Sequence, residues 1–173
     1  MKFWFEQTEP DQWFKKDPAF DASTRERFLG LHEALVSCEN HNLLADAQIA
    51  LAAVIVLDQM SRNMFRDTPR AFATDALALW LAEAAIARGF DAGLTKDQRI
   101  FLYLPFQHSE DRQLQARGVA LMASLGDAEQ SKWAEGHRAI VDRFGRFPHR
   151  NRILGRASTP EETEFLKQPG SSF

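Results

Sequence analysis

Residues 45–65 read ADAQIALAAVIVLDQMSRNMF, and this stretch decides the fold. An unbroken apolar run over residues 49–57 forms its first part. The run is only about half as long as a membrane span requires, and it is too apolar to lie at a protein surface. We therefore expect a central, buried helix over residues 45–65 and no membrane partner.

Capping patterns predict further helices on both sides of this stretch. Thr68-Pro69 predicts a helix that runs to Gly89, and Thr95 opens a capping box for a helix that ends before Pro105. No run of alternating β-branched residues competes with these signals. We predict an all-α fold of about seven helices, arranged as antiparallel helical hairpins. The other expected helices begin at Asp21 or Ser23, at Ser109, at Asp127 and at Thr159.

The domain organisation of the chain is predicted from its length and from where Pro, Gly and Ser residues occur. A chain of 173 residues suits one domain with its own core, and no linker divides it. We predict a single helical domain over residues 1–167 and a flexible tail over residues 168–173, where Pro, Gly and Ser gather. No repeat carries the tetratricopeptide signature, so a superhelix of that type would have to be irregular.

Composition and charge exclude several classes of function. A net charge of -3 argues against a nucleic-acid partner, because phosphate backbones reward a strongly basic surface. Cys38 is the only cysteine, so no intramolecular disulfide can form and a reducing cytoplasm is expected. The start of the chain, residues 1–6, reaches an acidic residue too early for a secretory signal.

The central helix turns polar where its apolar stripe should continue. Asp58 and Arg62 follow Leu51 and Val54 at the i, i+3/i+4 spacing, and Arg66 extends the row. A core helix that becomes polar over two turns can line a binding site. The alternative is an intrahelical Asp58–Arg62 pair at the protein edge, which contributes only about 0.3–0.5 kcal/mol when exposed.

A second group of polar residues lies at 108–111. His108 and Glu110 are candidates for acid–base chemistry, and Asp111 is a candidate ligand group. The alternative is local: Ser109 caps the next helix, and both carboxylates complement its dipole. No HExxH, CxxC or calcium-loop motif is present, so we predict no metal site.

Residues 143–152 read RFGRFPHRNR and crowd four arginines and a histidine together. Gly145 and Pro148 prevent a simple helix, so a structured turn should present the guanidinium groups to a carboxylate or phosphate. The same arginines could instead pair with acidic residues and lock helices together. The candidates in this turn are Arg146, His149 and Arg150, and nearby His137 is more simply explained as a core histidine.

Other kinds of chemistry have little support in the sequence. Cys38 stands beside a carboxylate that would raise the pKa of its thiol, and no serine lies in a GxSxG elbow. The glycines form neither a phosphate loop nor a dinucleotide fingerprint. We therefore expect no cofactor of the ATP, NAD or flavin kind.

Several long motifs resemble a family known as domain of unknown function 924. They are DQMSRNMFR with AFATD at 58–66 and 71–75, LPFQHSED at 104–111, RFGRFPHRN at 143–151 and GRASTPEE at 155–162. The resemblance covers essentially the whole chain and implies an all-α, tetratricopeptide-like superhelical fold. It implies no activity. Met60-Ser61 stands where we expect Phe-Pro in the family. This difference should affect the shape of the helix more than the chemistry of the candidate site.

Two functions fit these observations. The first is a pocket for a small anionic molecule, a carboxylate or phosphate, in which arginines bind and a histidine–carboxylate pair moves a proton. Its catalytic candidates are Asp58, His108, Glu110 and His149, and its ligand-binding candidates are Arg62, Arg66, Asp111, Arg146 and Arg150. The second is a helical scaffold that accepts a protein or an acidic peptide, with the polar motifs serving structure.

Overall fold

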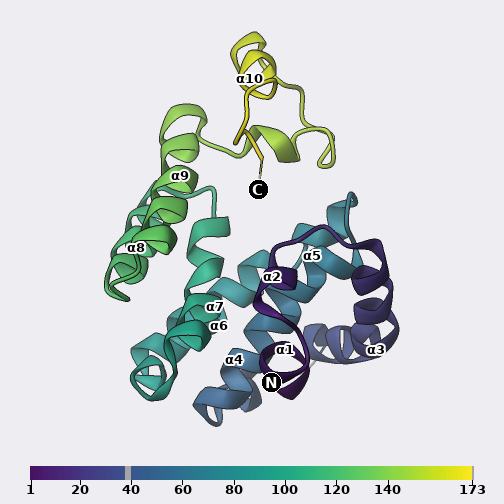
Figure 1. Ribbon diagram of the computed structural model, residues 1–173, viewed down its shortest axis with the longest axis vertical. Helices are drawn as coiled ribbons and strands as arrows, with labels where there is room; N and C mark the ends of the chain where they lie inside the picture. The colour runs from purple at the N-terminus through teal and green to yellow at the C-terminus, as the bar shows by residue number, and fades with distance from the viewer. Residues whose placement is uncertain (38–39, 173) are drawn as a thin grey trace. The chain divides into compact units, whose positions relative to one another are not determined.

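The computed structural model describes residues 1–37 and 40–172, and every regular element among them is helical (Figure 1). The prediction of an all-α fold is therefore confirmed for these residues. Cys38 lies outside the described residues. The described helices with seven or more residues are α3, Pro18–Ser37; α4, Ala47–Ile55; α6, Asp75–Ala87; α7, Lys96–His108; α8, Arg112–Ala123; and α9, Ala128–Phe144.

Shorter helical elements connect or extend these helices. A π-helical turn over Val56–Met60 continues α4 into α5, Ser61–Met64. The other short α-helices are α1, Lys2–Glu6; α2, Pro10–Trp13; and α10, Pro160–Phe165. Single 3-10 turns cover Asn40–Leu44, Pro69–Phe72, Phe90–Gly93 and Pro148–Arg150.

Two compact units make up the structure. The first unit comprises Met1–Arg66 and Arg70–Leu102, and the second comprises Asp67–Pro69 and Tyr103–Phe173. Each unit has its own packed helices and is described separately below. The single domain over residues 1–167 stays a prediction.

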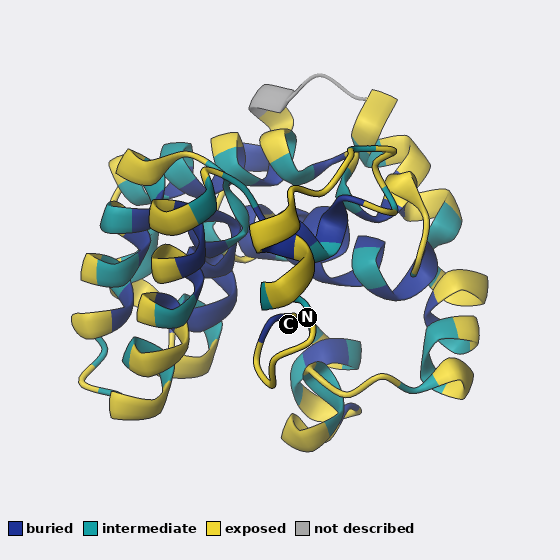
Figure 2. Ribbon diagram, turned by 90° about the horizontal axis from the view of Figure 1, so that it is seen from above, coloured by how far each residue is buried: buried dark blue, intermediate teal, exposed yellow. Residues whose placement is uncertain are grey.

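The central helix of the first unit is buried as its sequence predicts. Asp46 caps α4 by accepting hydrogen bonds from the backbone N–H groups of Gln48 and Ile49, and residues from 50 to 61 are buried except Ala52. This run packs against α6, while α3 packs against α5 and the π turn. No helix in the described part of the chain has the length and apolar character needed to cross a membrane. In Figure 2 buried residues, in dark blue, occupy helix faces that turn toward neighbouring helices.

The helix predicted to start at Thr68-Pro69 begins later in the structure. Residues from Pro69 to Phe72 form only a 3-10 turn, and α6 begins at Asp75. The hydroxyl of Thr74 turns away from α6 and donates to the Leu57 carbonyl at 2.5 Å. Leu57 lies in the π turn, so this hydrogen bond joins the residue before α6 to that turn.

Aromatic residues near the N-terminus pack onto the first unit. Trp4 is fully buried and meets the ring of Phe101 edge-on at 5.5 Å between centroids. The ring of Trp13 approaches the same phenylalanine at 4.9 Å. These aromatic residues therefore pack on the helices of the first unit.

An antiparallel hairpin of α8 and α9 forms the largest part of the second unit (Figure 1). Asp127 caps α9 as predicted, but α8 is capped by Asp111 rather than by Ser109. Gly118 lets α8 approach α7, because a Cβ at this position would lie 3.0 Å from the Cβ of Phe106. The helix α7 also continues through Pro105 to His108, four residues beyond the predicted end.

The turn after α9 closes over a small apolar core. Gly145 ends α9 with a left-handed φ of 69°, a conformation that favours glycine. Phe147 then inserts beside Ile140 and Val141, and Phe144 and Phe165 cover them. The segment 168–172 is not wholly detached from this unit, since Ser171 is buried and donates to the Leu166 carbonyl.

Candidate functional site

The polar end of the central helix forms a satisfied network in the first unit. Asp58 is fully buried, and its carboxylate accepts from Arg62 at 3.1 Å and from Gln59 at 2.6 Å. Arg62 also donates through two nitrogens to both oxygens of Asp75, at 2.8 and 3.0 Å. The predicted intrahelical pair is therefore present, but it is buried at Asp58 and shared with a second carboxylate that sequence reasoning missed.

Arg66 belongs to another ion pair of the same unit. Its Nε and Nη2 atoms donate to the two carboxylate oxygens of Asp21, at 2.5 and 2.8 Å. Asn63 donates to the same carboxylate at 2.8 Å. The prediction that α3 begins at Asp21 or Ser23 is wrong, because Asp17 accepts from the first N–H groups of a helix that already starts at Pro18.

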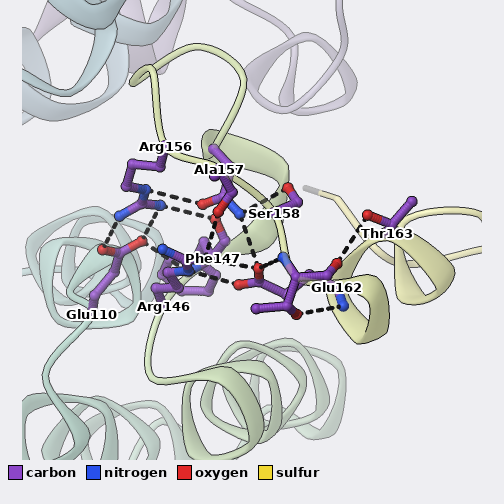
Figure 3. A network of polar contacts seen from close by, with 10 residues as sticks. Glu110, Arg146, Phe147, Arg156, Ala157, Ser158, Glu162 and Thr163 are labelled. Carbon is purple, nitrogen blue, oxygen red and sulfur yellow. Dashed lines mark hydrogen bonds and ion pairs between the residues drawn. The ribbon is translucent and has the colours of Figure 1, made fainter.

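In the second unit, Glu110 and Arg156 bracket the backbone of Phe147 (Figure 3). Glu110 accepts from the Phe147 N–H at 2.8 Å, and Arg156 donates to the Phe147 carbonyl at 3.1 Å. The two side chains also join each other through bonds of 2.7 and 2.9 Å. Burial alone would raise the pKa of Glu110, but these donors lower it overall.

Arg146 is held by a buried carboxylate on α10. Its Nε and Nη2 atoms donate to Glu162 at 2.6 and 2.8 Å, and Nη2 also donates to the Ala157 carbonyl. Glu162 is only 2% exposed and also accepts from the Thr159 N–H within a capping box. The hydrogen bonds from Arg146 are the main reason that the pKa of Glu162 falls to about 2. Glu162, Arg156 and Asn151 were missed as network members, although the motif at 155–162 contains two of them.

Histidines from different elements of the second unit gather around Phe147. The ring of His137 on α9 lies 5.8 Å from the Phe147 ring and 6.2 Å from His108 at the end of α7. His149 lies 5.6 Å from the same phenylalanine ring, and the guanidinium of Arg150 lies over it at 4.5 Å. We call these four residues, His108, His137, His149 and Arg150, the histidine cluster.

His137 is the buried member at the centre of this cluster. Its Nδ1–H donates to the Trp133 carbonyl at 2.8 Å, which fixes the tautomer of the neutral ring. Burial is the main reason that its pKa falls to about 3, and the charges of His108, Arg150 and His149 lower it further. The neighbouring charges that act on this ring are thus cationic, and the environment favours a neutral imidazole at physiological pH.

The structure gathers only part of the predicted site in one unit. His108, Glu110, Arg146, His149 and Arg150 belong to the second unit, and Asp58, Arg62 and Arg66 belong to the first. Convergence of all three segments on one pocket stays a prediction. Asp111 has an observed local role, since its carboxylate accepts from the N–H groups of Gln113 and Leu114. Within residues 1–37 and 40–172, no group of three or more His, Cys, Asp or Glu side chains could hold a metal ion.

Comparisons with known proteins agree with the resemblance in the motifs. The family model described as a bacterial protein of unknown function, DUF924, matches residues 1–170. A solved structure, that of the protein of unknown function ATU0120 from Agrobacterium tumefaciens, is 46% identical with a TM-score of 0.91. The match covers 96% of this chain and 93% of that one. No curated protein matches the chain.

Proposed function

Because the chain belongs to the bacterial family DUF924, whose description carries no activity, we propose a function from the side chains of the second unit. The proposal is that the histidine cluster binds a small anionic molecule, a carboxylate or a phosphate, in the cytoplasm. The observation that carries it is the placement of His137, His149 and Arg150 against the Phe147 ring. His108 lies beside His137 in the same cluster. Imidazole and guanidinium groups both donate hydrogen bonds to anions, and arginine can do so with two nitrogens.

The surrounding network supports the proposal by fixing the turn that carries His149 and Arg150. Phe147 is fully buried, and Glu110 and Arg156 hold both its N–H and its carbonyl. Arg146 holds the start of the same turn to Glu162. A site whose side chains are fixed in advance loses less entropy when a ligand binds.

The roles within the proposed site differ from those that the motifs first suggest. Arg146 and Glu110 support the turn through their bonds to Glu162 and Arg156. The residues that would bind the anion are therefore Arg150 and the histidines. The lowered pKa of Glu110 makes its carboxylate a weak base at neutral pH. Any acid–base chemistry at this site therefore belongs to His108 and His149, which are half-buried.

The alternative is a tetratricopeptide-like scaffold that binds a protein or an acidic peptide. The α8–α9 hairpin is the kind of unit that an irregular superhelix of that type would stack, as the family resemblance implies. A peptide groove should expose aromatic residues, and Phe106 and Phe147 are fully buried while Trp80 is 44% exposed. The burial of two of these three aromatic residues favours the small anion.

A thermal-shift screen tests the proposal. The purified chain is melted with inorganic phosphate, phosphate esters and mono- and dicarboxylates, beside the variants Arg150→Gln and His149→Gln. A ligand that binds only the folded state stabilises it by about 2.7 kcal/mol at a hundredfold excess over Kd. We expect at least one anion to raise the Tm of the wild type but not of the folded variants.

The matched control is Arg138→Gln, which removes an arginine from α9 outside the histidine cluster. Arg138 is about half exposed and pairs with Asp142 at 3.2 Å, one helical turn further along α9. This variant should keep the full anion response. An unchanged Tm with every anion, or a response that survives in both cluster variants, would overturn the proposal.

A further inference from the structure

The side chain of Asn151 joins the two ion pairs that Figure 3 shows in the second unit, Arg156–Glu110 and Arg146–Glu162. Its Oδ1 accepts from Arg156 Nε at 3.0 Å, and its Nδ2 donates to Glu162 Oε2 at 3.4 Å. The Asn151 carbonyl also accepts from the Arg156 N–H, at 2.8 Å. Asn151 is 1% exposed, so water has little access to these bonds. One buried amide therefore connects the two ion pairs.

Among side chains of this length, only an amide can make both side-chain bonds. Arg156 Nε–H can only donate, and the ionised carboxylate of Glu162 can only accept. The Asn151 side chain must therefore accept on one side and donate on the other. An aspartate would keep the acceptor but lose the donor, and an apolar side chain would lose both. The direction of the amide is fixed for the same reason, since the reversed amide would face Arg156 with Nδ2 and Glu162 with Oδ1.

The four residues before α10, 156–159, are each held by a different bond to this network, and we call them the strap. The bonds run from Arg156 to Glu110 at 2.7 and 2.9 Å, from Arg146 to the Ala157 carbonyl at 2.9 Å, from Asn151 Nδ2 to Ser158 Oγ at 3.1 Å and from the Thr159 N–H to Glu162 at 2.7 Å. The strap has no regular secondary structure, so these bonds rather than a helix hold its position. Glu110 also accepts from the Phe147 N–H, which ties the network to the turn at 146–151.

We infer that the turn at 146–151 and the strap open and close in one cooperative step, because Asn151 couples the two ion pairs. Local opening in cooperative segments is a general property of native proteins. His149 and Arg150 lie inside this turn, so one opening step moves both side chains together, whether or not they bind an anion.

Partial opening of this network is unfavourable at either end. If Arg156 moved away alone, the buried Oδ1 of Asn151 would lose its donor. If Arg146 moved away alone, the buried carboxylate of Glu162 would lose two donors. An unpaired polar group that stays buried costs more than its hydrogen bond contributes. Opening the turn and the strap together exposes these groups to water at once, so it avoids both costs.

Amide hydrogen exchange of the full chain, followed by NMR, tests the inference. Three N–H groups report on different parts of the network: that of Phe147 bonds to Glu110, that of Arg156 to the Asn151 carbonyl and that of Thr159 to Glu162. We expect the same protection factor for all three amides and a larger one for amides inside α8. Three unequal values, or values as large as those in α8, would show that the turn and the strap have no opening step of their own and would overturn the inference.

Asn151→Asp distinguishes coupled ion pairs from independent ones. It keeps the acceptor for Arg156 and adds an attractive charge there, but it removes the donor to Glu162 and sets a second carboxylate against it. Independent pairs would respond in opposite directions, with protection rising at the Arg156 amide and falling at the Thr159 amide. If the pairs are coupled, the turn and the strap share the loss, and we expect protection at all three amides to fall by one common factor of about ten or more. Asn42→Asp adds the same charge at an exposed asparagine of the first unit and should change none of them.

Glu110→Gln tests the coupling from the other end of the network and replaces Asn151→Asp if that variant does not fold. Gln keeps an acceptor for the Phe147 N–H, but it meets Arg156 with an amide N–H group in place of one carboxylate oxygen. We expect the Thr159 amide, whose partner is Glu162, to lose protection by the same factor as the amides of Phe147 and Arg156. A loss at Phe147 and Arg156 that leaves Thr159 unchanged would overturn the inference, and so would opposite changes in Asn151→Asp.

Discussion

The direction of three hydrogen bonds in the first unit follows from one carbonyl group. The Leu57 carbonyl can only accept, so the single hydroxyl hydrogen of Thr74 points to it. Ser61 must therefore donate to Thr74 Oγ1 at 3.1 Å, and the Nε2–H of His32 must donate to Ser61 Oγ at 2.9 Å. His32 is thus a donor and not a base in this pair. The contact resembles a nucleophile–base pair only in its distance, and Ser61 is fully buried.

This order of donors makes the Thr74 hydroxyl a stability determinant of the π turn. Thr74→Val removes the donor to Leu57 and the acceptor for Ser61 but keeps the side-chain shape. A buried polar group that loses its partner costs about 1–3 kcal/mol, so we expect a loss of that size in the free energy of unfolding. Urea unfolding followed by circular dichroism measures it.

Thr74→Ser is the control, because it keeps the hydroxyl and loses one methyl group. It should retain most of the stability that Thr74→Val loses. Equal losses in both variants would mean that the methyl group, and not the hydroxyl, supports the turn.

At the scale of elements, two neighbouring ion pairs of different burial hold α10 to the end of α9 and to the turn that follows it. Arg146 pairs with Glu162, which is 2% exposed, whereas Arg143 pairs with Glu161, which is 63% exposed. Buried carboxylates depend on their partners far more than exposed ones do, because water cannot replace the missing donor. The two pairs therefore offer a matched comparison within one interface between elements.

Arg146→Ala should lower the Tm by several degrees, while Arg143→Ala should change it little. The first variant leaves the buried Glu162 carboxylate without its two guanidinium donors. Differential scanning calorimetry at pH 7 measures both. The double variant Arg146→Ala with Glu162→Gln should recover part of the loss, since it removes the buried charge. Similar Tm values for the two single variants would contradict this account of the α10 contact.

Helix boundaries show which local signals were sufficient and which were not. Asp127 and Thr159 were predicted as helix starts and are caps: Asp127 has no other capping side chain next to it, and Thr159 directly precedes a proline at the first helical position. Before α8, Ser109 and Asp111 both have capping side chains, and Asp111 takes the position. Ser109 instead accepts from the Asp111 N–H, so it supports the cap that replaced it. The local sequence identifies the possible N-cap residues, but the backbone conformation decides which of them caps the helix.

At the scale of the whole molecule, the sequence identified polar residues better than it identified their partners. The Asp58–Arg62 pair was predictable, because helical spacing alone brings residues four apart together. The partners of Glu110 and Arg66 lie 46 and 45 residues away along the chain, and no spacing rule reaches so far. For this reason a motif rich in arginine suggested a ligand where the structure places Glu162 against Arg146.

Two kinds of titratable group lower the stability of the protein in acid: buried histidines and a buried carboxylate. Burial lowers the pKa of His137 to about 3 and also lowers the pKa of His32. Below pH 6.5 these histidines are therefore protonated in the unfolded chain but stay neutral in the folded chain. Each of them lowers the free energy of unfolding by at most about 1.4 kcal/mol per pH unit. Hydrogen bonds from Arg146 lower the pKa of Glu162 to about 2, so the stability from this carboxylate is present above pH 4.5 and lost as pH falls toward 2.

We therefore expect unfolding free energy to be level from about pH 8 to 7, to decline below 6.5 and to decline more steeply below 4.5. His137→Gln should make the decline between 6.5 and 4.5 shallower but not level, because Gln does not titrate and His32 still contributes there. A steeper decline below 4.5 should remain. Glu162→Gln should do the reverse. Urea titrations at intervals of half a pH unit resolve the two regions. A decline between 6.5 and 4.5 that is as steep in His137→Gln as in the wild type would show that His137 is not the buried neutral group that governs it.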